Sequence, residues 1–594
     1  MKAVSLFCVF VVARLATLAG SPEWSFLTPF ALFWQDAAFI LGFAILEKVP
    51  RSRFVIGALY WLIALYVALN VPVVRMFSTP LTLPMLRAAR GTLADSISHH
   101  VDVMNLVSIG LVLATALVAP MCLHRATVKP GRHFYATVSI LAFIGFLSSA
   151  GGNGRGRNCV AALIVSAHQL VVPVEDTSDS RQTKVAERSA LASWQNATKG
   201  RNVMLVLLES TGARHLKFYG NELDPTPNLT RMAQSAIVFD RAYAVYPESI
   251  KGLFSILSSR YPAIETSTEN YRHIGQPSLA HALRAKGYRT VLFHSGRFMY
   301  LGMDDIIADR GYEQMFDAGA IGGQRESSFG VEEPATVERM LNWLEHLRVD
   351  EHFFLTYLPT AGHHPYLTPE PGPFSDETDA RRYLNALHYG DQALGQLIEG
   401  MKKLGRYENT LFIFCGDHGE AFGEHAGNFG HTLQIFEENV RVPLVVFAPG
   451  RTTTQQRVPH LASVIDIAPT ILDMLGLEVP VAYQGVSLLR VQPDAALFFT
   501  DYSSRLVGLR DGRWKFIYEF ESGRASLFDV EKDPRETIDL STAFPDRTRL
   551  FERRAKIWIA AQKESVLRES AHEKKLQLVQ VRKTYGPEGV TTRQ

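Results

Sequence analysis

The sequence of 594 residues predicts five membrane helices, then an α/β domain with a largely parallel sheet between helices, then a small antiparallel C-terminal subdomain. Three observations indicate this fold class. Five apolar runs occur within the first 150 residues. From residue 202, short apolar segments alternate with helical ones, as in a parallel sheet covered on both faces. Residues 505–530 then follow a strand-turn-strand pattern.

The apolar runs in the first part of the chain have lengths typical of membrane helices. Most approach the ~20 residues that a membrane span needs. The first run is short enough to be a signal peptide, but Arg14 interrupts it and four more runs follow, which favours a retained span. The runs cover residues 4–19, 29–46, 54–74, 105–122 and 134–150.

Basic residues between these runs predict the orientation of the chain. Residues 47–53 and 124–132 are short, basic loops, so the positive-inside rule places them and the N-terminus in the cytoplasm. With five spans, the chain after residue 150 is then expected on the outer side of the membrane. The loop at 75–100 also carries arginines, and its apolar, proline-rich middle predicts a segment that contacts lipids at the outer surface.

Composition and pattern divide the chain further. The net charge of +2 gives no reason to expect a nucleic-acid partner, and four cysteines do not make a disulfide scaffold. The predicted parts are a membrane domain (1–150), a linker (151–200), a catalytic domain (201–500), a β subdomain (501–545) and a charged helical tail (546–594). In the catalytic domain we expect strands at 202–208, 289–294, 353–357, 411–415 and 442–447, and helices at 277–286 and 380–404.

Two of these strands end in residues that can bind a metal. The apolar run at 412–415 leads into Asp417 and His418, and the run at 203–208 leads into Glu209. The carboxyl ends of parallel strands share one edge of the sheet, where open α/β sheets place their chemistry. Two carboxylates and one imidazole suit a divalent ion, so we expect these three side chains to form one site.

Ser249 is the candidate nucleophile. A proline-led turn at 246–248 runs into an apolar helix, and we expect Ser249 at its N-cap, a position that is often only structural. The N-terminus of a helix also stabilises an anion, and a serine beside a metal ion is a good nucleophile.

At this point the motifs resemble those of the sulfatase branch of the alkaline phosphatase superfamily. The resemblance covers about 202–540, and no single motif is decisive, but their order is highly specific. The motifs are 202–209, 225–229 ahead of 239–243, the turn at Ser249, 363–366, 416–425, 441–444, 466–470 and 527–534.

Three departures separate the chain from typical sulfatases. The residues after Ser249 lack the Pro and Arg that direct conversion to formylglycine, so an unmodified serine is implied. His431 stands near the position where sulfatases carry a Lys. In this respect the chain is similar to phosphoethanolamine transferases, which have a His there. A lone Glu209 follows the first strand, and this and the five spans resemble lipoteichoic acid synthases and their glycerol-phosphate transferase relatives. Residues 527–534 are sulfatase-like, so the position within the superfamily stays open.

The resemblance implies roles for the candidate residues. Glu209, Ser249, Asp417 and His418 would hold one divalent ion, zinc or manganese best, with magnesium or calcium as alternatives. His363 and His431 would bind the transferred group and move protons, and Lys251 would neutralise its charge or simply be solvated.

Three functions remain open. We expect an enzyme of the bacterial plasma membrane that transfers or hydrolyses a phosphoryl-linked group (phosphoglycerol or phosphoethanolamine type) on a lipid or envelope glycan outside the cell. The alternatives are a sulfuric ester hydrolase and an inactive scaffold. The sequence does not predict the oligomeric state.

Overall fold

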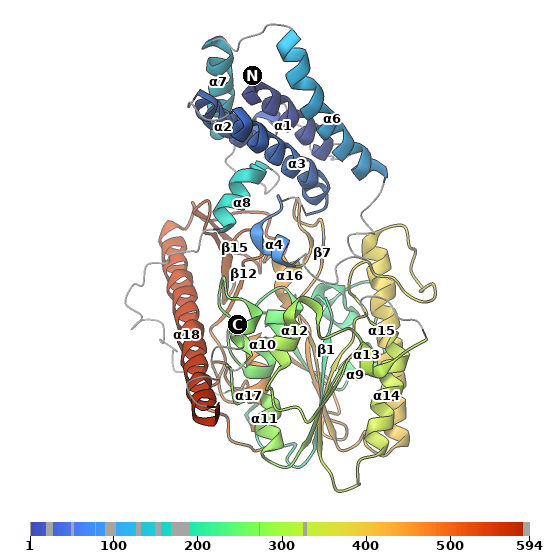
Figure 1. The fold of residues 1–594 in the computed structure, drawn as a ribbon. Coiled ribbons are helices and arrows are strands. Elements are labelled where there is room, and N and C mark those ends of the chain that lie inside the picture. Colours follow the sequence, from blue (N-terminus) through green and yellow to red (C-terminus); the bar gives the residue numbers. More distant parts are fainter. Residues whose placement is uncertain are drawn as a thin grey trace. The chain divides into compact units, whose positions relative to one another are not determined.

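The computed structural model describes residues 2–18, 28–48, 53–77, 79–88, 103–125, 132–148, 156–167, 189–272, 274–324 and 330–585. The chain forms two compact units. The N-terminal unit comprises Met1–Gln169 with the short segments Gly423–Phe429 and Tyr502–Ser504, and the larger unit comprises the remainder. Each unit is described by itself (Figure 1). Much of the predicted linker lies at 151–155 and 168–188, outside the described residues.

Each of the five predicted apolar runs coincides with a helix of the N-terminal unit. Of the described helices, two are long and apolar enough to cross a membrane, at Phe54–Arg75 and Val103–His124, with mean hydropathy of 2.1 and 2.4. The other three spans remain predictions. The helices of this unit are α1 (Lys2–Leu18), α2 (Thr28–Lys48), α3 (Arg53–Phe77), α4 (Leu83–Ala88), α6 (Val103–Arg125), α7 (Arg132–Ser148) and α8 (Cys159–Ala167).

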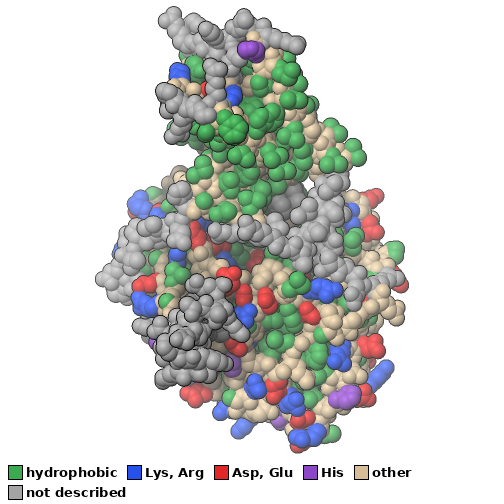
Figure 2. Space-filling model, in the orientation of Figure 1, with side chains coloured by type: hydrophobic (Ala, Val, Ile, Leu, Met, Phe, Trp, Pro, Cys, Tyr) green, Lys and Arg blue, Asp and Glu red, His purple; other side chains and the backbone are tan. Residues whose placement is uncertain are grey.

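Apolar side chains cover most of the described surface of this unit in Figure 2, whereas charged side chains are spread over the larger unit. The exposed residues include Phe54, Leu62 and Val107, which are 83%, 65% and 59% accessible. Such exposure is unusual for a protein in water and is typical of a surface that contacts lipid or another protein. The surface is thus consistent with the predicted membrane domain.

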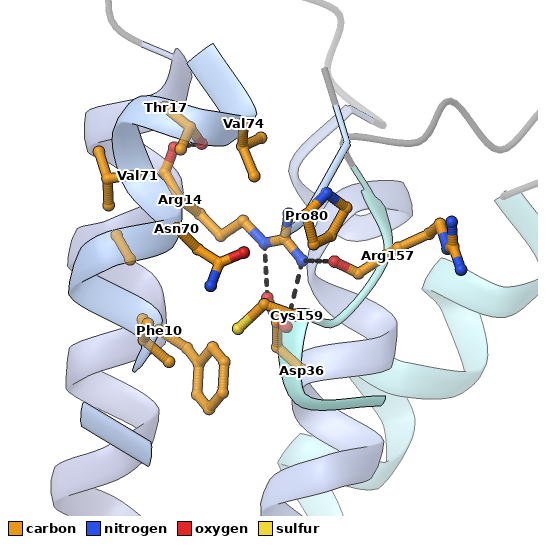
Figure 3. Close-up of a pocket in the computed structure, with 12 residues that line it drawn as sticks. Phe10, Arg14, Thr17, Asp36, Asn70, Val71, Val74, Pro80, Arg157 and Cys159 are labelled. Carbon is orange, nitrogen blue, oxygen red and sulfur yellow. Dashed lines mark hydrogen bonds and ion pairs between the residues drawn. The ribbon is translucent and has the colours of Figure 1, made fainter. Parts of the chain in front are cut away.

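The charge that interrupts the first apolar run is neutralised inside the N-terminal unit (Figure 3). Arg14 donates from Nε to Asp36 Oδ2 at 2.6 Å and from Nη2 to Oδ1 at 3.1 Å. Its Nη2 also donates to the carbonyl of Arg157 at 2.8 Å, and Asn158 donates to Asp36 at 2.7 Å. A buried charge is tolerated when it is paired and hydrogen-bonded, so α1 can keep this arginine among apolar helices.

The larger unit is built on a nine-stranded sheet with the order β11-β2-β10-β6-β1-β5-β3-β4, to which β9 adds beside β2. Strands β6, β1, β5, β3 and β4 are mutually parallel, which confirms the largely parallel sheet. The strands are β1 (Asn202–Leu208), β2 (Ile237–Tyr243), β3 (Arg289–His294), β4 (Gln314–Phe316), β5 (Phe353–Leu358), β6 (Thr410–Gly416), β9 (Arg441–Val442), β10 (Leu444–Phe447) and β11 (Gln456–Ser463).

Strand β10 departs from the parallel pattern, because it runs antiparallel to both β6 and β2. A parallel return needs a crossover of a dozen or more residues, usually a helix. The connection from β6 holds only short elements: the pair β7 (Ala421–Phe422) and β8 (Phe429–Gly430), the four-residue helix α16 (Glu437–Val440) and the two-residue strand β9. The sequence analysis did not predict β2 or β11, and it treated β9 and β10 as one strand.

Helices cover both faces of the sheet, because alternate residues of each strand point to opposite sides. Val203, Leu205 and Leu207 pack with α10, α11, α12 and α17, whereas Met204 and Val206 pack with α9, α14 and α15. The sheet therefore lies between two apolar cores. The helices are α9 (Pro227–Ala233), α10 (Ser249–Ser258), α11 (Leu279–Arg284), α12 (Met303–Ile307), α13 (Ala318–Ile321), α14 (Glu333–Glu345), α15 (Asp379–Lys403) and α17 (Ile467–Met474).

The C-terminal part forms a second, antiparallel sheet in the order β12-β13-β14-β15. Its strands are β12 (Ala495–Thr500), β13 (Leu506–Asp511), β14 (Trp514–Glu519) and β15 (Arg524–Asp529). The tail forms α18 (Pro545–Tyr585), whose Trp558 and Ile559 are buried against this sheet with Phe516. The predicted antiparallel subdomain is confirmed, and the tail helix docks on it.

Candidate metal and nucleophile site

The ends of two adjacent strands bring the predicted metal ligands together. Strands β1 and β6 pair in parallel, with Leu208 beside Gly416. The residues that follow them, Glu209 and Asp417, therefore leave the sheet side by side. Ser210 follows in a left-handed conformation, with φ of 53°, and its backbone N–H donates to Asp417 Oδ1 at 3.0 Å. This hydrogen bond connects the turn after β1 to the residue that follows β6.

Glu209, Asp417 and His418 form a compact buried group. Their ligand atoms all lie within 4.8 Å of one another. His418 Nε2 lies 3.5 Å from Asp417 Oδ2 and 3.7 Å from Glu209 Oε1. The structure thus assembles all three residues that the sequence analysis proposed as ligands of one ion.

The protonation of His418 suits metal binding. Its Nδ1 lies 3.0 Å from the carbonyl of Gly419, which as an acceptor assigns the proton to Nδ1 and leaves a lone pair on Nε2. Burial lowers the pKa of His418 to about 4, so the ring is neutral at pH 7. The lone pair of Nε2 can then be donated to a metal ion held beside the two carboxylates.

The two carboxylates differ in the hydrogen bonds that they accept: each Glu209 oxygen accepts from one hydroxyl, Ser210 Oγ at 3.0 Å and Ser249 Oγ at 2.9 Å. Asp417 Oδ1 accepts from the N–H groups of Ser210 and His418, but Oδ2 faces the His418 lone pair. Burial and the Asp417 carboxylate both raise the pKa of Glu209. Two buried carboxylates at this distance are stable as anions only beside a cation, so the donor set fits a divalent ion. Which ion binds stays a prediction, with zinc or manganese first and magnesium or calcium as alternatives.

Ser249 points its hydroxyl into this group. Its Oγ donates to Glu209 Oε2 at 2.9 Å and lies 3.2 Å from His418 Nε2. The predicted N-cap position is wrong. Glu248 is the cap of α10, since its carboxylate accepts from the N–H groups of Ile250 and Lys251 at 3.0 and 3.4 Å. Ser249 is the first residue of the helix, and its hydroxyl is left to face the ligands.

His431 lies on the other side of His418, with the two ring centroids 4.0 Å apart. Burial alone would lower its pKa, but Glu420 Oε2 lies 2.6 Å from its Nδ1, and this carboxylate raises the pKa to about 9. Tyr366 donates to the other oxygen of Glu420 at 2.6 Å. His431 is therefore an imidazolium at neutral pH, held in place by a buried carboxylate.

Glu420 was missed by the sequence analysis, although it directly follows Gly419 in the motif that supplied two ligands. Its ligand atoms and those of His418 and His431 form a second group within 4.8 Å. Because Glu420 already accepts from His431 and Tyr366, its role here is to orient and charge His431.

His363 lies on the loop after β5, and its Nδ1 is 2.6 Å from the carbonyl of His364. Burial, followed by the positive charge of nearby His431, lowers the pKa of His363. One neutral and one protonated histidine thus share the site.

Lys251 is engaged elsewhere. Its ammonium lies 2.9 and 3.1 Å from the two oxygens of Asp501 and 4.6 Å from the centroid of the Tyr246 ring. Binding the transferred group would require this ion pair to open, so that role remains a prediction.

Comparisons with known proteins identify the family. The profile of the family described as Sulfatase matches residues 201–477, and a profile described as N-sulphoglucosamine sulphohydrolase, C-terminal, matches residues 423–549. The catalytic part of the chain belongs to the sulfatase family of the alkaline phosphatase superfamily, and the members of that family are enzymes.

Relatives of two kinds match the chain. Lipoteichoic acid synthase-like YvgJ of Bacillus subtilis is 26% identical over 302 residues, 47% of this chain and 48% of that protein, so the match spans about half its length. Lipoteichoic acid synthase 2 of the same organism is 22% identical over 75% of each chain. Choline-sulfatase of Rhizobium meliloti is 24% identical over 57% of this chain and 82% of that protein.

A solved structure shares the fold. The lipoteichoic acid synthase LtaP from Listeria monocytogenes has a TM-score of 0.51 and 18% identity, over 66% of this chain and 98% of that one. This similarity shows the alkaline-phosphatase-like fold that the resemblance implied.

Proposed function

We propose that this protein is a membrane-anchored, metal-dependent enzyme that transfers or hydrolyses a phosphoryl-linked group through Ser249. The observation that carries the proposal is the position of Ser249 Oγ, 2.9 Å from Glu209 Oε2 and 3.2 Å from His418 Nε2. The residues after it lack the Pro and Arg that direct formylglycine formation in sulfatases, so the serine keeps its hydroxyl. An oxygen nucleophile of this kind suits phosphorus.

In the proposed reaction, Ser249 Oγ attacks phosphorus in line with the leaving oxygen. The Oγ–P bond forms as the bond to the leaving alcohol breaks. A divalent ion held by Glu209, Asp417 and His418 would supply Lewis acidity that favours the serine alkoxide. His363, neutral because its pKa is lowered, is the acceptor for the serine proton. His431, protonated because its pKa is raised, donates a proton to the leaving alcohol.

The second half of the reaction restores the serine. Water or an acceptor hydroxyl attacks the phosphorus bound to Ser249, and Oγ leaves. His431, now neutral, takes the proton of the attacking hydroxyl, and His363 returns its proton to Oγ. Attack by water gives a hydrolase and attack by an alcohol gives a transferase, so the acceptor decides between the two reactions.

The proposed substrates are lipid-linked or envelope glycan groups at the outer surface of a bacterial plasma membrane. The relatives named as lipoteichoic acid synthases and the two long apolar helices support this part of the proposal. The phosphoglycerol and phosphoethanolamine types are the chemical candidates. The near-neutral charge of +2 gives no field for a nucleic acid.

The second candidate function is hydrolysis of sulfuric esters. It is favoured by the similarity to choline-sulfatase and by the C-terminal profile of N-sulphoglucosamine sulphohydrolases. An inactive scaffold is a weaker alternative, because Ser249, the proposed ligands and His431 lie in two adjacent groups that share His418.

A panel of chromogenic esters tests these alternatives. The purified full-length protein is assayed with p-nitrophenyl phosphate, bis(p-nitrophenyl) phosphate and p-nitrophenyl sulfate, each with Mn²⁺, Zn²⁺, Mg²⁺ or Ca²⁺. Metal-dependent cleavage of a phosphate ester supports the proposal. Faster cleavage of the sulfate ester would favour the sulfatase, and no cleavage with any metal would favour the scaffold.

A further inference from the structure

Three charged side chains are buried together where the C-terminal sheet meets α16. Lys515, on β14, has a fully buried side chain, and its Nζ lies 3.1 Å from Glu437 Oε1 and 3.0 Å from Glu536 Oε1. The backbone N–H of Glu437 donates to Glu536 Oε2 at 2.7 Å. Tyr243 on β2 donates to the other oxygen of Glu437 at 3.1 Å. We call Lys515, Glu437 and Glu536 the α16 anchor.

Helix α16 depends on this anchor for its position. It has four residues, too few for a helix that is stable by itself. Its first residue is Glu437, whose backbone N–H and carboxylate are both held by the anchor. The end of the helix is tied to the central sheet, because Ala244 donates to the carbonyl of Val440 at 2.8 Å. The helix therefore bridges the two sheets.

Between these two attachment points, α16 contacts the two loops of the proposed site, which carry His418 and His431. The carbonyl of Asn439 accepts from the N–H of Gly419 at 2.8 Å, directly after His418. The Asn439 amide donates to the carbonyls of Gly430 and His431 at 3.2 and 3.4 Å. The backbones of Gly419 and Glu438 are closely packed, since a Cβ on Gly419 would lie 2.1 Å from the carbonyl oxygen of Glu438. One asparagine thus joins the loop that carries His418 to the loop that carries His431.

We infer that the α16 anchor is a positioning device, through which Lys515 of the C-terminal sheet sets the geometry of His418 and His431. The inference rests on the proposed function for the identity of the site. Lys515 touches none of the proposed ligands and acts only through Glu437 and Asn439. Residues that orient the ligands of a metal from behind affect metal affinity or activity by about 10- to 100-fold when they are changed.

A need for stability alone does not account well for such a cluster. Burying charges costs desolvation energy, and well-packed uncharged residues of similar volume often serve stability equally well. The cluster also joins three segments that lie far apart in the sequence, at 437, 515 and 536. These charges add a rigid, directional connection behind the two loops that carry His418 and His431.

The test uses full-length protein in which the anchor is neutralised as a unit, Lys515→Met with Glu437→Gln and Glu536→Gln. The triple variant keeps the volumes and removes the three charges of the anchor together. Mn²⁺ affinity is measured by calorimetry, and kcat and KM are measured with the best phosphate ester of the panel. We expect Mn²⁺ to bind about 10- to 100-fold more weakly and kcat to fall, with a thermal midpoint near that of the wild type. A folded triple variant with unchanged Mn²⁺ affinity and kcat would overturn the inference.

Two further variants keep the test decisive. Asn439→Ala leaves the three residues of the anchor in place and removes the side-chain link to the His431 loop. It should lower kcat, and if the triple variant does not fold, an unchanged kcat and Mn²⁺ affinity in Asn439→Ala would overturn the inference. The matched control is Arg554→Met with Asp511→Asn, which removes a partly exposed ion pair between α18 and β13 of the same sheet and should change neither quantity.

The outcome is separable from that of the proposed function. If the wild type cleaves no ester, the proposed function fails, but Mn²⁺ affinity still reports whether the anchor positions the ligands. If the wild type binds no Mn²⁺, the ligand assignment fails and the inference fails with it.

Discussion

The pair formed by Glu420 and His431 makes the stability of the metal-free protein depend on pH. Glu420 raises the pKa of the buried His431 from 6.5 to about 9. A group with a raised pKa in the folded state contributes its full stability below its unfolded pKa and loses it as pH rises through the folded value. The stability that this ion pair contributes is therefore lost between about pH 6.5 and about pH 9. With about 1.4 kcal/mol for each pKa unit, the contribution is about 3 kcal/mol.

Glu420→Gln removes the charge and keeps the shape of the side chain. Without the Glu420 carboxylate, the charge that raises the pKa of His431 most is gone, while Glu209 and Asp417 still raise it, so the variant should show less of this pH dependence. Thermal midpoints are measured for the full-length protein in EDTA at pH 6.0 and pH 9.5. The midpoint of the wild type should fall by about 5 °C more than that of the variant across this range.

A matched control is Glu345→Gln, an exposed residue at the end of α14, which should behave like the wild type. Equal pH dependence in the wild type and Glu420→Gln would refute the assigned ion pair. In the active enzyme the same change should lower activity most at alkaline pH, because His431 would then lack the proton that it donates.

Three more predictions follow from the site. Ser249→Ala should lower kcat by at least ~1,000-fold in the ester assay while Mn²⁺ still binds, and an undiminished rate would exclude Ser249 as nucleophile. Asp417→Ala combined with His418→Ala should abolish metal binding in elemental analysis, and full retention would contradict the ligand assignment. Glu333→Gln should lower kcat, because the buried Glu333 carboxylate accepts from the N–H groups of Thr360 and Ala361 at 2.7 and 2.8 Å and so holds the loop of His363. The neighbouring Glu332→Gln is its control, and equal rates in both would refute this role.

Much of the site could be predicted because its ligands lie at strand ends. Asp417 and His418 are adjacent in one motif, and Glu209 ends the neighbouring parallel strand, so local pattern and strand pairing suffice to bring them together. The same reasoning located β1 and β3 with the bounds that the structure has. Where an apolar run stops abruptly at polar residues, the sequence itself indicates where the strand ends.

The parts that were missed depend on contacts between distant residues. Lys251 pairs with Asp501, 250 positions away, and no local pattern indicates this partner. The direction of β10 depends on a connection without a long helix, which an alternating pattern does not reveal. The cap at Glu248 was misassigned because serine is the commoner cap, and only the fold shows which side chain reaches back over the helix.

The most direct measurement of the central claim is the mass of the peptide that contains Ser249. The full-length protein is incubated with Mn²⁺ and the best phosphate ester, quenched in acid and digested. A His431→Ala variant is treated in parallel, because His431 takes the proton of the attacking hydroxyl in the second step, whereas a p-nitrophenolate leaving group needs little protonation in the first. The account predicts an unmodified serine before incubation and a phosphorylated or phosphodiester-linked Ser249 afterwards. Formylglycine at this position, or turnover in which Ser249 never carries phosphorus in either protein, would contradict it.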